Sequence, residues 1–285
     1  VQSANYNFTI NRQDVNQYGQ LGRIDSIVTE SPTVSLDFSY YLTNGENERL
    51  LGFNVNGAES CVAGRLSADD SEGQNFFILT TKEGTDAIDN DLTAGDENSV
   101  ISLGNGFLSD YSVDLSVGAL PTANVTIEGF NIKTDVGTTG LQIPGIDPLA
   151  GTFLAGYTGK QFSVPVARKD NATGVGGIQE SALRPGDISL DLKDAGELAV
   201  IGGGSTNTDK TSCHVQSVSI SVPLSRTVLE RLGSNFGFTR VVDYPVNATV
   251  SISATLADLK QGNLLERIYE EESSGPRKGL SKAHD

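Results

Sequence analysis

The chain lacks several residue types on which particular functions depend. Its 285 residues include no methionine or tryptophan, and only two cysteines and two histidines. Cys61 and Cys213 are too few and too far apart in sequence for a disulfide framework or a CxxC metal site. We therefore expect two free, mostly buried thiols, and neither a metal ion nor another cofactor.

Basic residues and long apolar runs are also scarce. The chain has 20 lysines and arginines against 36 aspartates and glutamates, which gives a formal net charge of −16. Such a protein has no basic face with which to attract phosphates, so binding of nucleic acid by charge attraction is not expected. No uncharged apolar window reaches the length of about 18 residues that a membrane helix needs, and we expect no membrane partner.

Signatures of catalysis are missing as well. The adjacent residues Cys213 and His214 could act as nucleophile and base, but neighbouring residues on a strand point to opposite faces. The glycine-rich segments at 156–160 and 202–210 do not match the G-x-x-x-x-G-K-[ST] spacing of a phosphate-binding loop. The chain is therefore expected not to be an enzyme.

The patterns that are present predict an all-β fold. Apolar residues alternate with polar ones in segments such as 6–10, 34–40 and 113–117. Alternation rich in β-branched and aromatic residues is typical of half-buried strands. Glycine-containing turns are expected between strands at 43–47, 104–106, 118–121, 174–177 and 202–204. We expect a β-sandwich or barrel with one or two short flanking helices.

Three segments have helical patterns. The strongest prediction is a helix at 225–233, with Ser225 as N-cap and Gly233 at its end. A weaker pattern covers 12–21. Another covers 256–270, where Gly262 interrupts the apolar spacing.

The sequence contains a possible internal duplication. Residues 1–22 align without a gap on the segment that begins at Val215: both start with VQS, continue as an alternating strand, and share Arg12 with Arg226 and Gly19 with Gly233. The pattern predicts a unit of strand, short helix, loop and strand over 1–42 and 215–256. The alternative to a duplication is that two unrelated β-hairpins have similar amino-acid compositions. Residues 107–128 predict a simpler hairpin of similar texture.

These patterns predict two β-rich regions and a tail. The first covers 1–135, the second covers 136–270 and contains the repeat at 215–256, and residues 271–285 are expected to form a flexible C-terminal arm.

Three segments, 1–53, 75–87 and 106–132, resemble the major tail and virion structural proteins of tailed bacteriophages. The resemblance implies a tail-tube fold, assembled into stacked rings whose inner sheets enclose a channel for DNA. It implies as partners other copies of the chain, other tail proteins, and DNA that passes without specific binding. It also implies a place in the virion tail, after synthesis in the cytoplasm of a bacterial host. Residues 133–212 have no counterpart in the resemblance.

A channel for DNA should repel phosphates, and an excess of carboxylates does so. The acids concentrate at 69–97, and the candidates for the channel wall or the ring contacts are Asp69, Asp70, Glu72, Asp86, Asp89, Asp91, Asp96 and Glu97. Acidic loops that only keep the protein soluble are the main alternative. A calcium site is a weaker one, because the order of these acids does not match an EF-hand.

Contacts between subunits are expected at basic residues and polar loops. The candidate basic residues are Arg12, Arg23, Arg49, Arg226 and Arg231. The loops at 43–49 and 69–97, and the chain from Glu270 onward, are expected to bridge neighbouring subunits. We expect six chains per ring. A trimeric pseudo-hexameric ring is the alternative if both repeats act as tube domains.

Other functions stay open at this point. Another virion protein, such as a head-decoration or tail-terminator protein, fits the same sequence. So does a secreted β-sandwich adhesin or carbohydrate-binding module. A sugar site normally needs exposed aromatic platforms, and with no tryptophan and 7% aromatic residues the chain offers few of them.

Overall fold

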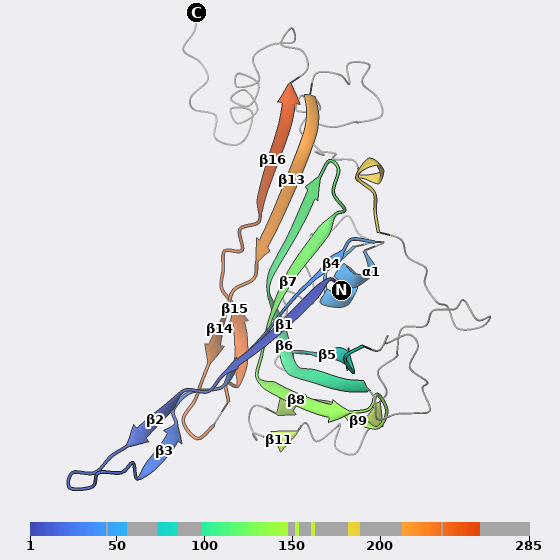
Figure 1. Cartoon of the computed structure of the whole chain (residues 1–285). Coiled ribbons are helices and arrows are strands. Elements are labelled where there is room, and N and C mark those ends of the chain that lie inside the picture. The colour runs from blue at the N-terminus through green and yellow to red at the C-terminus, as the bar shows by residue number, and fades with distance from the viewer. Residues whose placement is uncertain are drawn as a thin grey trace, which may run out of the picture.

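The computed structural model describes residues 1–43, 45–55, 73–84, 98–147, 152–153, 161–162, 182–188, 213–234 and 236–256. Within these ranges it contains sixteen strands, the helix α1 and a short 3₁₀ turn, so the all-β prediction is confirmed (Figure 1). No helix in this part of the chain is long and apolar enough to cross a membrane.

The strands are β1 (Ser3–Thr9), β2 (Arg12–Val15), β3 (Asp25–Val28), β4 (Thr33–Tyr41), β5 (Gln74–Thr81), β6 (Asn98–Ser116), β7 (Thr122–Gly129), β8 (Asn131–Val136), β9 (Leu141–Gln142), β10 (Ile146–Asp147), β11 (Thr152–Phe153), β12 (Gln161–Phe162), β13 (Cys213–Pro223), β14 (Arg226–Leu229), β15 (Thr239–Val242) and β16 (Thr249–Leu256). The helix α1 is Glu46–Leu51, and the 3₁₀ turn is Pro185–Asp187.

The main sheet has the antiparallel order β1-β4-β7-β6-β13-β16. Its centre is the β6–β7 hairpin, which confirms the hairpin predicted at 107–128. The outer strands β13 and β16 come from the second of the two predicted regions but continue the sheet built by the first.

Strand β6 belongs to two sheets because it bends in its middle. Its second half lies in the main sheet, and its first half pairs with β5 and β8 (Figure 1). The bend is at Gly104–Gly106, where Asn105 has a left-handed φ of 55°. A Cβ on Gly104 would lie 2.3 Å from the carbonyl oxygen of Pro144, so only glycine fits there. The prediction of a turn at 104–106 is wrong, since the chain bends without reversing.

Asn105 is fully buried, and its side chain forms the two hydrogen bonds that a neighbouring strand would otherwise form with the backbone of Ile146. Its Nδ2 donates to the carbonyl oxygen of Ile146 at 2.9 Å, and its Oδ1 accepts from the Ile146 N–H at 2.8 Å. Both backbone groups of Ile146 are thereby satisfied inside the core.

The main core lies on one face of the main sheet. Alternate residues of the four central strands face it, and α1 with Phe53 closes it: Val34, Leu36, Tyr40, Leu51, Phe53, Leu108, Tyr111, Val113, Ala123, Val125, Ile127 and Val222. The helix covers residues 46–51, so the loop predicted at 43–49 is helical from residue 46 onward. The helix begins after Gly45 and ends at Gly52, both in left-handed conformation.

Two core tyrosines hold the helix through one carboxylate. The hydroxyls of Tyr40 and Tyr111 donate to Glu48 Oε1 at 2.8 and 3.1 Å. Burial is the largest cause that raises the pKa of both phenols above the usual 10.0, and the negative charge of Glu48 raises both further.

This arrangement predicts a loss of stability in alkali. Below pH 10 both phenols are neutral in the folded and the unfolded chain. Above it, the unfolded chain releases protons that the folded chain keeps, so the free energy of unfolding falls by about 1.4 kcal/mol per pH unit for each tyrosine. Urea unfolding between pH 8 and 11 measures this slope. A Tyr40→Phe/Tyr111→Phe variant should be less stable at pH 8 but show a shallower slope, and an equal slope in both proteins would refute the assignment.

The two similar segments fold as the same unit. Each residue of the first has its counterpart 214 positions later: Ser3 pairs with Ser39 as Ser217 pairs with Ser253, and Arg12 pairs with Val28 as Arg226 pairs with Val242. In both units a long strand leads into a small hairpin and returns as a second long strand. The order of the sheet places one unit on each side of the β6–β7 hairpin.

The helices predicted at 225–233 and 12–21 are wrong. Residues 226–229 and 12–15 are the strands β14 and β2, and each pairs with the next strand along the chain. Gly233 and Gly19 have left-handed φ values of 88° and 93° and lie in the turns of these hairpins rather than ending helices. The pattern was ambiguous because a short apolar run fits either structure. Beyond Leu256, the helix predicted at 256–270 lies outside the described residues.

Candidate functional site

The most extensive functional candidate is the face of the main sheet that points away from the core. One row of paired residues crosses all six strands of this face and consists of Ser3, Ser39, Asn124, Ser112, Ser221 and Thr249. A second row contains Tyr41, Thr122, Asp114, Ser219 and Ser251, and a third contains Asn5, Asp37, Thr126, Asp110 and Pro223. We call these residues the polar face.

The polar face carries carboxylates but neither lysine nor arginine. Asp37 and Asp114 are exposed, and Asp110 is half-buried, which raises the pKa of its carboxyl. Farther along β7, Glu128 pairs with Arg240 of the β14–β15 hairpin. The face is therefore acidic near its centre, and at its end Arg240 neutralises the carboxylate of Glu128.

Hydrogen bonds between strands hold the side chains of this face. Thr126 Oγ1 donates to Asp37 at 2.7 Å, and Ser219 Oγ donates to Asp114 at 2.9 Å. The Ser3 and Ser39 hydroxyls are 2.8 Å apart. Most side chains of this face are short and are tied to one another, so they form a continuous polar wall across the strands.

The carboxylates of such a wall can repel phosphates, but its side chains include few groups that could bind a phosphate or act in catalysis. The wall has no lysine or arginine to bind a phosphate, and no cysteine or histidine to act as nucleophile or base. Within the described residues, no group of three or more histidine, cysteine or acidic side chains could hold a metal ion. Cys213 and His214 stand side by side at the start of β13.

The structure shows some of the predicted site residues. All eight candidate acids between Asp69 and Glu97 lie outside the described residues. Three of the candidate arginines contact their own chain: Arg23 pairs with Asp14 at 3.0 Å, Arg49 pairs with Glu46, and Arg226 lies over the ring of Phe107 at 5.1 Å. Arg12 and Arg231 are exposed.

The acids of the polar face were missed by the sequence reasoning. Asp37 and Asp114 occupy polar positions of alternating strands, in VSLDFSY and YSVDLS. The signal was that every polar position near them is serine, threonine, asparagine or an acid, and none is basic.

Within the described part of the chain, the two edge strands of the main sheet carry no feature that prevents pairing with another strand. Neither β1 (SANYNFT) nor β16 (TVSISATL) contains a charged residue or a proline. On the core side Tyr6, Phe8 and Val250 are 48, 55 and 52% exposed. Natural edge strands normally carry lysine, proline or a bulge that prevents pairing with another chain. Both edges are thus suited to pair with a further strand.

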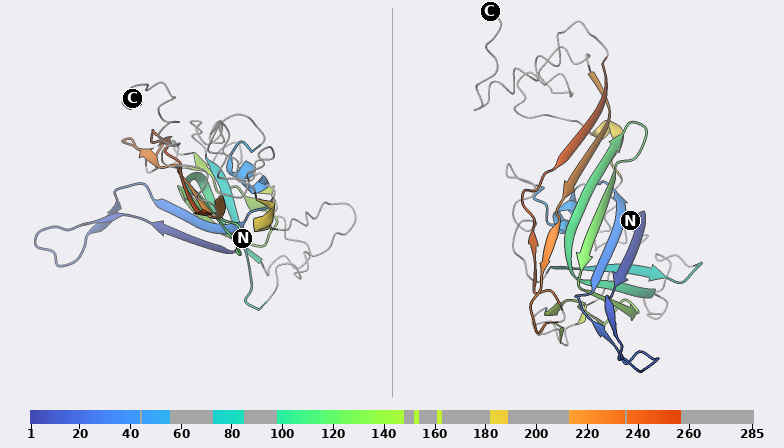
Figure 2. Two further views of the ribbon diagram at one scale, coloured as in Figure 1. Left: turned by 90° about the horizontal axis from the view of Figure 1, so that it is seen from above. Right: turned by 90° about the vertical axis from the view of Figure 1, so that its left-hand side faces the viewer.

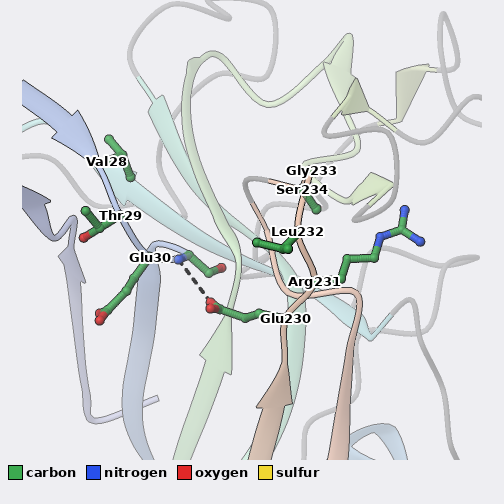
Figure 3. Close-up of a pocket in the computed structure, with 9 residues that line it drawn as sticks. Val28, Thr29, Glu30, Glu230, Arg231, Leu232, Gly233 and Ser234 are labelled. Carbon is green, nitrogen blue, oxygen red and sulfur yellow. Dashed lines mark hydrogen bonds between the residues drawn. The ribbon is translucent and has the colours of Figure 1, made fainter.

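A cleft of about 380 Å³ lies between the end of β3 and the turn of the β14–β15 hairpin. Its walls are two loops, residues 28–31 and 230–234 (Figure 3). Glu230 reaches across and accepts the Ser31 N–H at 3.2 Å, while Arg231 points away. The lining of the cleft contains no cysteine or histidine, and its main feature is the contact between two hairpins.

Comparison with known proteins identifies no family for this chain: no model of a protein family matches it, and no curated protein matches it significantly.

Proposed function

We propose that the protein is the structural subunit of a phage tail tube, in which copies join edge to edge and their polar faces line a channel for DNA. The observation that carries the proposal is the polar face, six strands wide, acidic at its centre and without lysine or arginine. A wall of this kind repels the DNA backbone and offers it no donor cations, so DNA can slide past.

The sheet edges support the assembly that this function needs. β1 and β16 are antiparallel to each other in the order of the sheet, so β16 of one copy can pair with β1 of the next as antiparallel neighbours. Both strands carry serine, threonine or asparagine on the polar side and apolar residues on the core side. Pairing therefore continues both faces across the junction, and repetition closes a barrel.

Strand spacing favours three copies per ring over six. Strands lie about 4.8 Å apart and tilt by about 40° in a barrel, so each takes up roughly 6 Å of circumference. Three six-strand sheets then give a backbone diameter of about 36 Å, and six give about 72 Å. Short side chains narrow either backbone diameter further, and the smaller barrel of three copies is the one that suits a single DNA duplex. We therefore propose three chains rather than the six expected from sequence.

Electron microscopy and native mass spectrometry of the purified protein test this function. We expect hollow rings or tubes and a ring mass of three 30.1 kDa chains. Monomers at every concentration would contradict the proposal and favour a binding module instead. Sixfold rings would be compatible with a tube but would refute the prediction of three chains per ring.

A further inference from the structure

The two equivalent hairpins of the repeat units differ in their surroundings. We call residues 10–32, which include β2 and β3, the first arm, and residues 224–248, which include β14 and β15, the second arm. The first arm projects away from the rest of the protein, whereas the second lies close to the sheets (Figures 1 and 2). The same fold unit is thus covered in one copy of the repeat and bare in the other.

The second arm buries one face against its own chain. Arg226 lies over the ring of Phe107, and Arg240 lies over the ring of Phe130 at 4.7 Å while it pairs with Glu128. Val228 of the same arm packs on the small core formed by Phe107, Phe130 and Ile146. Arg240 is 2% exposed, and this burial lowers the pKa of its guanidinium.

The counterparts in the first unit are apolar but exposed. Leu224, Val222 and Val242 are 0, 6 and 7% exposed, and their counterparts Ile10, Phe8 and Val28 are 40, 55 and 46% exposed. The side chain of Arg12, the counterpart of Arg226, is exposed and makes no hydrogen bond or ion pair with another described residue. The first arm therefore has the composition of a packed hairpin without a surface to pack on.

The turn of the second arm contacts the other repeat unit of the same chain. It touches the base of the first arm, where Glu230 accepts the Ser31 N–H (Figure 3). The Gly237 N–H also donates to Ser31 Oγ at 3.3 Å. An arm thus reaches the base of the repeat unit that precedes it in the sheet. No unit precedes the first one in its own sheet, because β1 is the edge strand.

We propose that the first arm is an intermolecular element that lays its Arg12 and Val28 face on the base of the second arm of an adjacent copy. This inference rests on the proposed edge-to-edge assembly, in which the unit beyond β1 is the β13–β16 unit of that copy. Within one chain the turn of the second arm touches the base of the other unit, and its Arg226 face packs on Phe107 and Phe130, so the proposed contact between copies uses the corresponding face of the first arm on a different surface.

The base of the second arm suits this occupant. Tyr244 and Val241 are 69 and 43% exposed there, and Asp243 is exposed beside them. An arginine can stack on the tyrosine ring and pair with the carboxylate, as Arg226 and Arg240 do with Phe107, Phe130 and Glu128. The exposed Val28 then has an apolar neighbour.

A photo-crosslinking amino acid at position 12 of the full chain tests this contact. In assembled protein we expect crosslinks between chains to peptides that contain residues 241–246. Arg12→Ala and Val28→Asp should each weaken assembly about tenfold or more, because each removes or opposes a contact that is buried on association. Their melting temperatures as monomers should stay near that of wild type, since both side chains are exposed. Val117→Asp, which changes an exposed apolar residue in the β6–β7 turn in the same way as Val28→Asp, is the matched control and should assemble normally.

Two results would overturn the inference. One of them would also refute the proposed tube assembly, and the other would not. Rings that form normally in both variants, with crosslinks from position 12 only within one chain, would refute the docking of the arm and leave the tube intact. A wild-type protein that never assembles would refute the tube and the docking together.

Discussion

Assemblies in which Asp37 and Asp114 are both replaced by lysine should retain DNA that the wild-type assembly releases. Both carboxylates lie on exposed positions of the polar face, so the change replaces two negative charges per copy with two positive ones. Each new phosphate contact strengthens binding and adds about 0.9 to the slope of log affinity against log salt for duplex DNA. With several copies facing one duplex, we expect retention to rise by orders of magnitude at about 50 mM salt and to fall steeply toward 200 mM.

Filter retention of labelled duplex by assemblies checked in the microscope measures this effect. The Asp37→Asn/Asp114→Asn variant is the control, because it removes the same charges and hydrogen-bond acceptors without adding cations. It should retain far less DNA than the lysine variant. If lysine-substituted assemblies released DNA as wild type does at low salt, the polar face would not line the channel.

Lysine at the sheet edges should abolish assembly while the chain stays folded. In a Phe8→Lys/Val250→Lys variant, the new charges lie at exposed edge positions of the monomer but would be buried where β16 meets β1 of the next copy. An unpaired charge at such a junction costs several kcal/mol, so the association constant should fall by at least about 100-fold.

Sedimentation velocity and thermal unfolding separate assembly from folding in this variant. The matched control is Val117→Lys/Leu120→Lys, which changes two exposed apolar residues in the β6–β7 turn, away from both edges. The control should assemble as wild type does. Intact rings in the edge variant would show that β1 and β16 do not form the junction.

The alternation of the sequence was enough to predict the fold class and the equivalence of the two repeat units. In a half-buried strand, apolar residues on the buried face alternate with polar residues on the exposed face, so the pattern is visible in the sequence of the strand itself. The helix prediction at 225–233 failed since RTVLERLG fits a helix cap and a β-hairpin equally well. Pairing of Arg226 with Val242, 16 positions away, decided the outcome, and local sequence contains no information on that pairing.

The polar face could not have been located from sequence for a similar reason. Its first row joins Ser3, Ser112 and Ser221, which come from distant parts of the chain, and only the strand order brings them together. The sequence pointed to the acids at 69–97 because they are adjacent along the chain. The bend at Asn105 was missed because its cause is the close approach of Pro144 and Ile146, which also depends on the tertiary fold.

A reconstruction of the assembled protein by cryo-electron microscopy, at a resolution that separates strands, tests the central claim most directly. The proposal predicts a closed barrel in which β16 of each copy pairs antiparallel with β1 of the next, with Asp37 and Asp114 facing the channel. A ring whose polar faces point outward, or whose copies meet through surfaces other than these two edges, would contradict it.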